Sequence, residues 1–279
     1  MRGLSISVAC LFVQFSVCQE LRFQRLTTEN GMSDNAINCL HQDRAGHLWI
    51  GTEGGLDRYD GQRMDHIAGS EFAISGITED IQGRIWAATK GDGLLLVDHT
   101  KRSVERLYRR TDDPKSIASD QLTAVFDLND TTLLLGSREQ TLIFMDKRTS
   151  TFSYWTDSTS LDPKRASAIP VGRSGWCHAI TPLGDDLLWV GLLNNHMSLL
   201  VDRRSSRITR RLTTKRTGSE TQSCALQHDD LLYLGGWQKG IDALPIERAS
   251  ELEESGSRVP WVIEPPDEVQ AVRRGLERS

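Results

Sequence analysis

An internal repeat constrains this 279-residue chain more than any other feature. The segment from Asn35 to Asp60 returns almost position for position between Ile74 and Asp98, including a buried-looking strand of the pattern Leu-Trp-Ile-Gly-Thr. Fainter copies follow, and the tryptophan position of that strand recurs at Trp49, Trp86, Leu134, Trp189 and Tyr233. Five copies at intervals of 37 to 55 residues predict an architecture in which each unit buries its apolar faces against its neighbours.

Each copy is expected to form consecutive short β-strands. Its first strand alternates apolar and polar residues, which is typical of a half-buried strand. Asp43 and Gly46 then bracket a tight turn, and Asp80 and Gly83 occupy the same positions in the second copy. Asp hydrogen-bonds to nearby backbone and Gly accepts a positive φ, so both residues suit a turn. The second strand, which contains Gly51 in the first copy, is apolar throughout and should be buried on both faces, with the glycine admitting a neighbouring backbone or ring.

Four strands every 40 to 50 residues, with an aromatic-glycine pattern in each unit, predict an all-β fold, a β-propeller of four-stranded blades. The expected blades span residues 33–67, 73–108, 120–155, 176–212 and 221–247, and residues 267–279 resemble the start of a further blade. About five complete blades with additional partial strands predict an incomplete, open ring that leaves strand edges unpaired.

The first 18 residues are expected to be a signal peptide rather than part of the fold. Arg2 supplies a positive start, Leu4 to Val17 is mostly apolar, and small residues precede Gln19. Fourteen residues of helix span roughly 21 Å, which is short for a bilayer core of about 30 Å. An uncleaved anchor or a buried N-terminal element is the alternative. The remainder, residues 19–279, is then the propeller, with a periplasmic or secreted location and no transmembrane span.

Composition narrows the class of protein further. Hydrophobic residues make up 38% of the chain, charged residues 25%, and the net charge is −5. These values exclude a polytopic membrane protein, a collagen-like fibre and a largely disordered chain, and they disfavour a general nucleic-acid partner. The cysteines that remain after the signal peptide lack metal-site spacing and lie in apolar runs, so buried thiols are expected at Cys39, Cys177 and Cys224.

The best-preserved copy resembles a known family. Gly31-Met-Ser-Asp-Asn35, Leu48-Trp-Ile-Gly-Thr52 and Gly55-Leu-Asp-Arg-Tyr-Asp-Gly61 look like the two-component regulator propeller repeat. The resemblance is close over residues 23–98 and looser to about residue 245. It implies the extracytoplasmic sensor half of a bacterial hybrid histidine kinase, in which seven blades usually precede an immunoglobulin-like segment, a membrane span and an output domain. Against that pattern, the chain is expected to be a truncated sensor, a gene fragment or a stand-alone module.

No catalytic motif stands out. Gly51 to Gly55 lacks the Lys-Ser/Thr pair of a phosphate loop and recurs as a connection between strands. There is no GxSxG or SxxK element, and the seven histidines show no metal-ligand spacing. We therefore expect no enzyme activity, no cofactor and no metal. The basic run from Arg203 to Arg216 is expected to be a solvated face, with contact to an anionic glycan as the alternative.

A ligand, if one binds, is expected on the axial face where the first strands of the blades begin. Amide side chains and an aromatic ring there suit a carbohydrate or another small ligand, and the candidate residues are Asn35, Gln121, Trp176, His178 and Gln222. They could equally be ordinary loop residues.

The expected function is a non-catalytic sensory or ligand-binding module of a two-component system, whose partner is an output kinase or a second propeller on another chain. Two alternatives remain open. One is a propeller enzyme resembling streptogramin-type lyases, which requires His178, His196 and His228 to converge near the axis. The other is a purely structural interaction scaffold.

Overall fold

The computed structural model describes residues 23, 25–98, 100–113, 115–138, 142–154, 176–193, 197–213, 222–236 and 240–246. These residues form nineteen β-strands and one short 3-10 helix, η1 (Thr28–Asn30). The predicted all-β class is therefore confirmed. No helix in this described part is long and apolar enough to cross a membrane. The predicted signal peptide and the residues 267–279 lie outside the described residues.

The strands form five antiparallel sheets, which we call blades 1 to 5. Blade 1 contains β1 (Ile37–Gln42), β2 (Leu48–Thr52), β3 (Leu56–Tyr59) and β4 (Met64–His66). Blade 2 contains β5 (Ile74–Glu79), β6 (Ile85–Thr89), β7 (Leu94–Asp98) and β8 (Ser103–Tyr108). Blade 3 contains β9 (Leu122–Asn129), β10 (Thr132–Ser137), β11 (Leu142–Asp146) and β12 (Thr151–Tyr154). Blade 4 contains β13 (Trp176–Leu183), β14 (Leu187–Leu193), β15 (Met197–Asp202) and β16 (Arg207–Thr213). Blade 5 has three strands in the described residues, β17 (Gln222–His228), β18 (Leu231–Gly236) and β19 (Gly240–Pro245).

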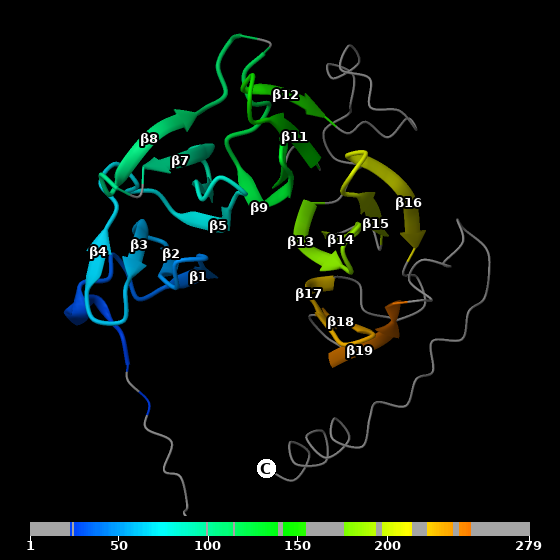
Figure 1. Ribbon diagram of the computed structural model, residues 1–279, viewed down its shortest axis with the longest axis horizontal. Coiled ribbons are helices and arrows are strands. Elements are labelled where there is room, and N and C mark those ends of the chain that lie inside the picture. Colours follow the sequence, from blue (N-terminus) through cyan, green and yellow to red (C-terminus); the bar gives the residue numbers. More distant parts are fainter. Residues whose placement is uncertain are drawn as a thin grey trace, which may run out of the picture.

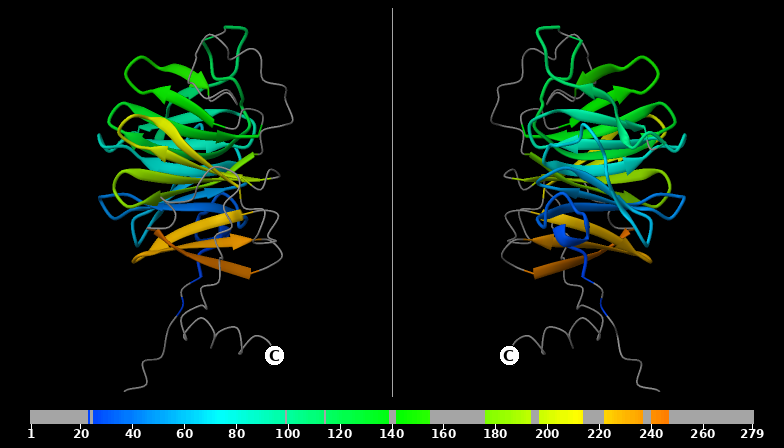
Figure 2. Two further views of the ribbon diagram at one scale, coloured as in Figure 1. Left: turned by 90° about the vertical axis from the view of Figure 1, so that its right-hand side faces the viewer. Right: turned by 90° about the vertical axis from the view of Figure 1, so that its left-hand side faces the viewer.

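The blades follow one another around an axis, with their first strands innermost (Figure 1). Successive first strands contact each other from β1 through β5, β9 and β13 to β17. No comparable contact joins β17 to β1 among the described residues, and Figure 1 shows an opening between blade 1 and blade 5. The side views in Figure 2 show the blades as stacked, twisted sheets. The predicted propeller fold is confirmed, and within the described part the ring is open.

Each blade has a forward face, toward the next blade, and a back face, toward the preceding one. At the first boundary Trp49 and Leu56 on the forward face of blade 1 pack against Ile85 and Leu95 on the back face of blade 2. The same arrangement recurs at the other three boundaries. The second strands β6 and β10 are almost entirely buried, because a neighbouring blade covers each face. The apolar character of these strands is thus explained by blade stacking.

The glycine of the second strand allows the close approach that the sequence predicts, but the approaching group is a cysteine side chain. A Cβ at Gly51 would lie 2.5 Å from Cys39 Sγ, and one at Gly136 would lie 2.6 Å from Cys177 Sγ. Cys177 is buried and Cys39 is partly buried, and both are free thiols. Burial raises the pKa of each thiol to about 12. Cys224 has no described side chain.

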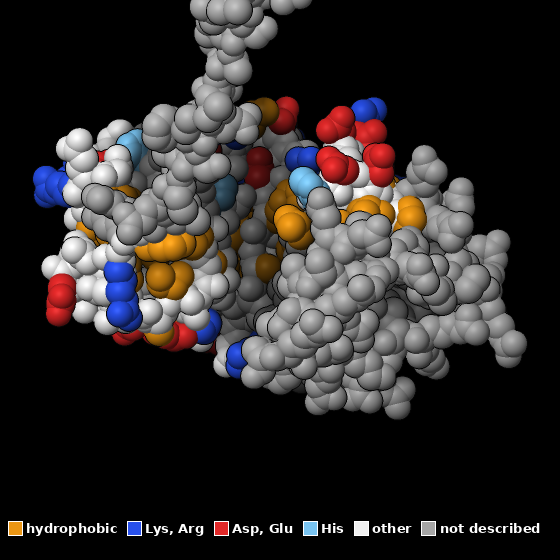
Figure 3. Space-filling view, turned by 90° about the horizontal axis from the view of Figure 1, so that it is seen from below, with side chains coloured by type: hydrophobic (Ala, Val, Ile, Leu, Met, Phe, Trp, Pro, Cys, Tyr) orange, Lys and Arg blue, Asp and Glu red, His pale blue; other side chains and the backbone are white. Residues whose placement is uncertain are grey.

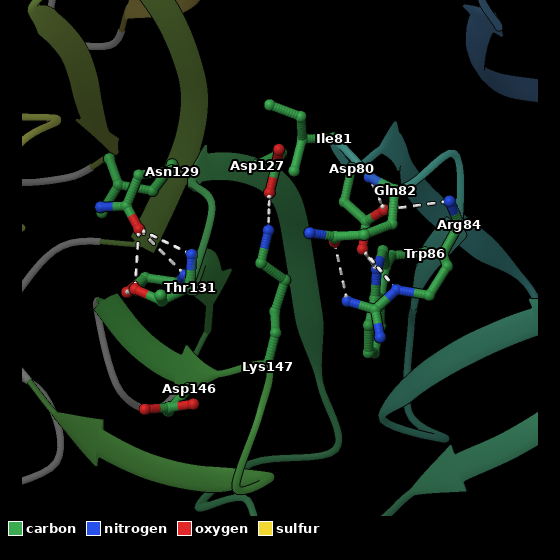
Figure 4. A network of polar contacts seen from close by, with 12 residues as sticks. Asp80, Ile81, Gln82, Arg84, Trp86, Asp127, Asn129, Thr131, Asp146 and Lys147 are labelled. Atoms are coloured by element: carbon green, nitrogen blue, oxygen red, sulfur yellow. Dashed lines mark hydrogen bonds and ion pairs between the residues drawn. The ribbon is translucent and has the colours of Figure 1, made fainter.

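The axial face at which the first strands end and turn into the second strands is called the turn face. In blade 2, Asp80 accepts backbone hydrogen bonds from Gln82 and Arg84 and a side-chain bond from Trp86 (Figure 4). Asp43 plays the same part with Trp49 in blade 1. The predicted turn role of these aspartates is therefore accompanied by a second role, as the acceptor for the buried indole of their own blade.

Candidate ligand-binding face

The opposite axial face, at which the first strands begin, is called the start face. Near its start, every first strand has a register shift against the second strand. The residue at that bulge is polar in all five blades: Asn38, Ser75, Thr123, His178 and Ser223. A bulge leaves one residue out of the ladder and re-aims its side chain. The backbone of the start face therefore has a bulge in each innermost strand, and the sequence places a polar residue at each bulge.

Two of these bulge residues join neighbouring blades. Ser75 Oγ donates a hydrogen bond to the backbone oxygen of Leu122 in the next blade at 2.9 Å. Thr123 Oγ1 donates in the same way to the backbone oxygen of Cys177. Because both hydroxyls are used between blades, their first role is to fix the spacing of the innermost strands.

Asn38, at the bulge of blade 1, takes part in a charged cluster instead. Its side-chain oxygen accepts a hydrogen bond from Lys90 Nζ at 2.9 Å, and Lys90 also forms an ion pair with Glu53. The hydrogen bond from Lys90, followed by one from Asn38, lowers the pKa of Glu53. Glu53 and Lys90 lie in the second-to-third strand turns of blades 1 and 2, and both side chains are partly exposed. The Asn38–Glu53–Lys90 cluster thus spans two blades and is open to solvent.

Of the predicted ligand residues, Gln121 lies beside this cluster. It forms an isolated β-bridge with Lys90, and its backbone oxygen accepts a hydrogen bond from Arg138 N. Its side chain is exposed. The structure therefore brings a third blade to the same place on the start face, with an amide available to the solvent.

Asn35 is also exposed, but its amide is already engaged. Thr28 N donates to Asn35 Oδ1 at 2.9 Å, and Asn35 Nδ2 donates to Thr28 Oγ1 at 3.3 Å. These two bonds thus lie within the leading segment, residues 25–36, and join its two ends. Trp176, His178 and Gln222 have described backbones at the starts of β13 and β17, and their side chains lie outside the described part of the structure.

The histidines proposed for the lyase alternative are not all within reach of one another. His178 is near the start of β13, whereas His228 is the last residue of the neighbouring strand β17, at the turn face. These two residues therefore lie at opposite ends of adjacent strands. His196 is not among the described residues. The residues that are described contain no group of three or more His, Cys, Asp or Glu side chains arranged to hold a metal ion.

A polar constellation missed by the sequence analysis lies at the start-face end of blade 1. Asp57 is fully buried and accepts from Ser33 N at 2.8 Å and from Ser33 Oγ. His66 Nδ1 lies 2.8 Å from Ser33 Oγ and 3.0 Å from the Asp57 carboxylate. In a Ser-His-Asp triad the serine and the aspartate contact different ring nitrogens. Here both contact the same nitrogen, so this constellation does not activate Ser33.

The constellation of Ser33, Asp57 and His66 holds the leading segment over the back face of blade 1. Met32, in this segment, is buried, and Asn30 closes a capping box with Thr27 at the preceding 3-10 turn. One sequence signal could have revealed Asp57. Blades 2 to 4 carry Leu95, Ile143 and Leu199 at the same position of the third strand, whereas blades 1 and 5 carry Asp57 and Asp242. The buried carboxylate of Asp57 lies on the back face of blade 1, which no preceding blade covers among the described residues.

Comparison with known families gives one sequence match. Residues 31–54 match the profile described as two component regulator propeller. They cover the end of the leading segment, β1, the following turn and β2, and they include Asn38 and Glu53. The sequence has no match among curated proteins.

Solved structures show the same fold. A protein assigned as the extracellular domain of a hybrid two component system from B. thetaiotaomicron is similar with a TM-score of 0.57, at 20% identity, over 86% of this chain and 38% of that one. An inactive variant of virginiamycin B lyase from Staphylococcus aureus is similar at 0.55, with 14% identity over 78% and 72% of the two chains. A chain of the mitotic checkpoint complex is similar at 0.58, with 13% identity over 88% and 73%. This chain spans about two fifths of the first of these proteins.

Proposed function

Because this chain carries a two-component regulator propeller repeat within a fold of propeller blades, we propose that it is a non-catalytic, extracytoplasmic sensory module that binds a small ligand on its start face. The observation that carries this proposal is the Asn38–Glu53–Lys90 cluster. Two of its members belong to the matched repeat itself, and the cluster lies at the solvent-exposed inner rim of that face.

The charges of the start face favour a neutral ligand rich in hydroxyl groups. Lys90 is neutralised by Glu53, and Arg109 by Asp92 in the neighbouring turn. Both of these cations are therefore paired, and the described part of the face offers hydrogen-bond donors and acceptors beside them. A carbohydrate hydroxyl both donates and accepts, so it can bridge Glu53 and an amide such as that of Gln121. A carbohydrate is the ligand class that we propose.

Any signal would pass to an output domain on another polypeptide, such as a kinase or a second propeller. Ligand binding can shift such a system only by the difference in its affinity for two arrangements of the blades. The cluster meets that requirement in principle, because Asn38 and Glu53 are in blade 1 while Lys90 is in blade 2. A ligand that contacts both sides is sensitive to the relative position of the two blades.

A carbohydrate array probed with the purified chain tests the proposal, followed by titration of the strongest neutral oligosaccharide. Glu53→Gln removes the charge that holds Lys90, and we expect it to weaken binding about tenfold, the effect of one lost charged hydrogen bond. The matched control is Glu105→Gln, on the exposed outer strand β8, which should bind like the wild type. Absence of binding to every carbohydrate, or equal affinity of the two variants, would contradict the proposal.

A further inference from the structure

The forward face of blade 5 is left uncovered in the described part of the chain. Leu226 pairs with Tyr233 across β17 and β18 and is 64% exposed. The residues at the same position in blades 2 and 4, Thr78 and Thr181, pair with the blade tryptophans and are only 8% and 7% exposed. A leucine is thus open to water where even threonines are buried elsewhere. Figure 3 looks into the opening between blades 1 and 5, where hydrophobic side chains are visible.

The interior boundaries show what covers such a face. At the boundary of blades 2 and 3, Leu122 and Val125 of the first strand β9 are buried in the cluster that contains Trp86. The bulge hydroxyl of Ser75 donates to the backbone oxygen of Leu122. A Cβ at Gly76 would lie 3.2 Å from Ala124 Cα, so the two innermost strands are in close contact. The cover is therefore a short strand with two apolar residues flanking a polar bulge residue and an alanine.

Residues 267–272, which are not among the described residues, have this sequence. Asp267-Glu-Val-Gln-Ala-Val272 aligns without a gap with Asp120-Gln-Leu-Thr-Ala-Val125. The alanine is identical, the apolar positions are Val269 and Val272, and the bulge position is polar Gln270. The number of residues between the third strand and the next first strand also agrees with this alignment. Asp98, at the end of β7, is 24 positions before Leu122, and Pro245, at the end of β19, is 24 positions before Val269.

We propose that residues 267–272 dock as an innermost strand on the forward face of blade 5, with Val269 and Val272 covering Leu226 and Tyr233. The occupant of this exposed face is therefore a segment of the same chain. Ser223 is the bulge residue of β17, the place that Ser75 holds in β5, and Val269 takes the position of Leu122. Glu268, the counterpart of Gln121, then adds a carboxylate to the start face from a sixth position around the axis.

Two chain lengths test this docking directly. A chain ending at Val272 keeps the whole segment, whereas a chain ending at Pro265 lacks it, and both keep blades 1 to 5. Hydrogen exchange of β17 amides is the readout, and exchange of β5 and β6 amides reports that the rest of the fold is intact. We expect the chain ending at Val272 to match the full chain. The chain ending at Pro265 should lose at least about tenfold in β17 protection, as expected when a covering element is removed.

Point variants in the full chain separate docking from a general effect of truncation. Val269→Asp places a charge against Leu226 and should reproduce the loss of β17 protection, because a charge is costly on an apolar contact. Glu268→Ala, whose counterpart Gln121 is exposed, should leave protection unchanged. Equal β17 protection in the two shortened chains, or in Val269→Asp and the wild type, would overturn the proposal whether or not the chain binds a carbohydrate.

Discussion

The indole nitrogen of Trp86 donates a hydrogen bond to Asp80 Oδ2 at 2.9 Å, between two fully buried side chains of one blade. Trp49 makes the same bond to Asp43 at 2.8 Å. Blade 4 lacks it. Leu183 stands six residues before Trp189, at the position of the aspartate, and Trp189 Nε1 is buried without a hydrogen-bond partner in the described part of the structure. The turn aspartate therefore accepts the hydrogen bond of the core tryptophan in blades 1 and 2, whereas in blade 4 that donor has no partner among the described residues.

This difference predicts unequal effects of the same substitution. Trp86→Phe removes the hydrogen bond to Asp80. It should lower the free energy of unfolding by about 1–3 kcal/mol more than the loss of packing alone. Trp189→Phe removes a buried donor that has no partner in the described part of the chain, so it should cost only the loss of packing. Denaturant unfolding of the two variants measures the difference in the free energy of unfolding. Equal losses would show that the Asp80 bond has no net stabilising effect.

The carboxyl group of Asp80 should make the stability of the fold depend on pH. Burial alone would raise the pKa of Asp80, but hydrogen bonds from Trp86 and Arg84 outweigh it and hold the pKa below its ordinary value of 3.8. A carboxyl group whose folded pKa is lowered stabilises the fold above its unfolded pKa, and that contribution disappears as the pH falls through the folded value. The stability gap between wild type and Asp80→Asn should therefore be largest near neutral pH and shrink below about pH 4. A gap that is independent of pH would contradict this assignment.

Lys147 and Asp127 form a buried ion pair, so we expect the effects of substituting these two residues on stability to be strongly coupled. Lys147 Nζ reaches from the turn after β11 to Asp127 Oδ1 on the innermost strand β9, at 2.5 Å (Figure 4). Burial raises the pKa of Asp127 despite the lysine. Breaking a buried pair on one side costs about 3–5 kcal/mol, whereas replacing both partners with apolar residues is often nearly neutral. Asp127→Leu and Lys147→Met should each destabilise blade 3, and the double variant should recover much of the loss in urea unfolding.

The hydrogen bonds of Ser33 should determine how firmly the leading segment is attached to blade 1. Ser33→Ala removes the hydroxyl that bonds to the fully buried Asp57 carboxylate, so we expect a loss of about 1–3 kcal/mol. Limited proteolysis should also cut residues 25–36 faster, because fewer bonds hold them to blade 1. Combining Ser33→Ala with Asp57→Leu, the residue type of Leu95 and Leu199, should restore part of the stability. A double variant less stable than Ser33→Ala would show that the back face of blade 1 does not accept the interior residue type.

Much of the fold could be predicted because the repeat is local. Trp49 and Trp86 occupy the same place in successive copies, and alternation with turn residues defines strands within about twenty residues. The position of the start face also follows from the sequence, since the first strands of the blades begin there. That a ligand binds at this face, and that the named residues contact it, stays a prediction. Asn35 could be recognised as exposed, but its bond to Thr28 joins two turns and depends on the path of the leading segment.

The sequence by itself determined the blade, the order of its strands and the strand that is buried on both faces, because each rests on contacts between residues close together in the chain. The tertiary structure alone decided which polar residues act together. Lys90 meets Asn38 across 52 positions of sequence and Ser75 meets Leu122 across 47. Such pairings depend on the angle and register between neighbouring blades, and a repeat pattern describes each blade without that relation. Both the Asn38–Glu53–Lys90 cluster and the uncovered Leu226 are products of how the blades stack.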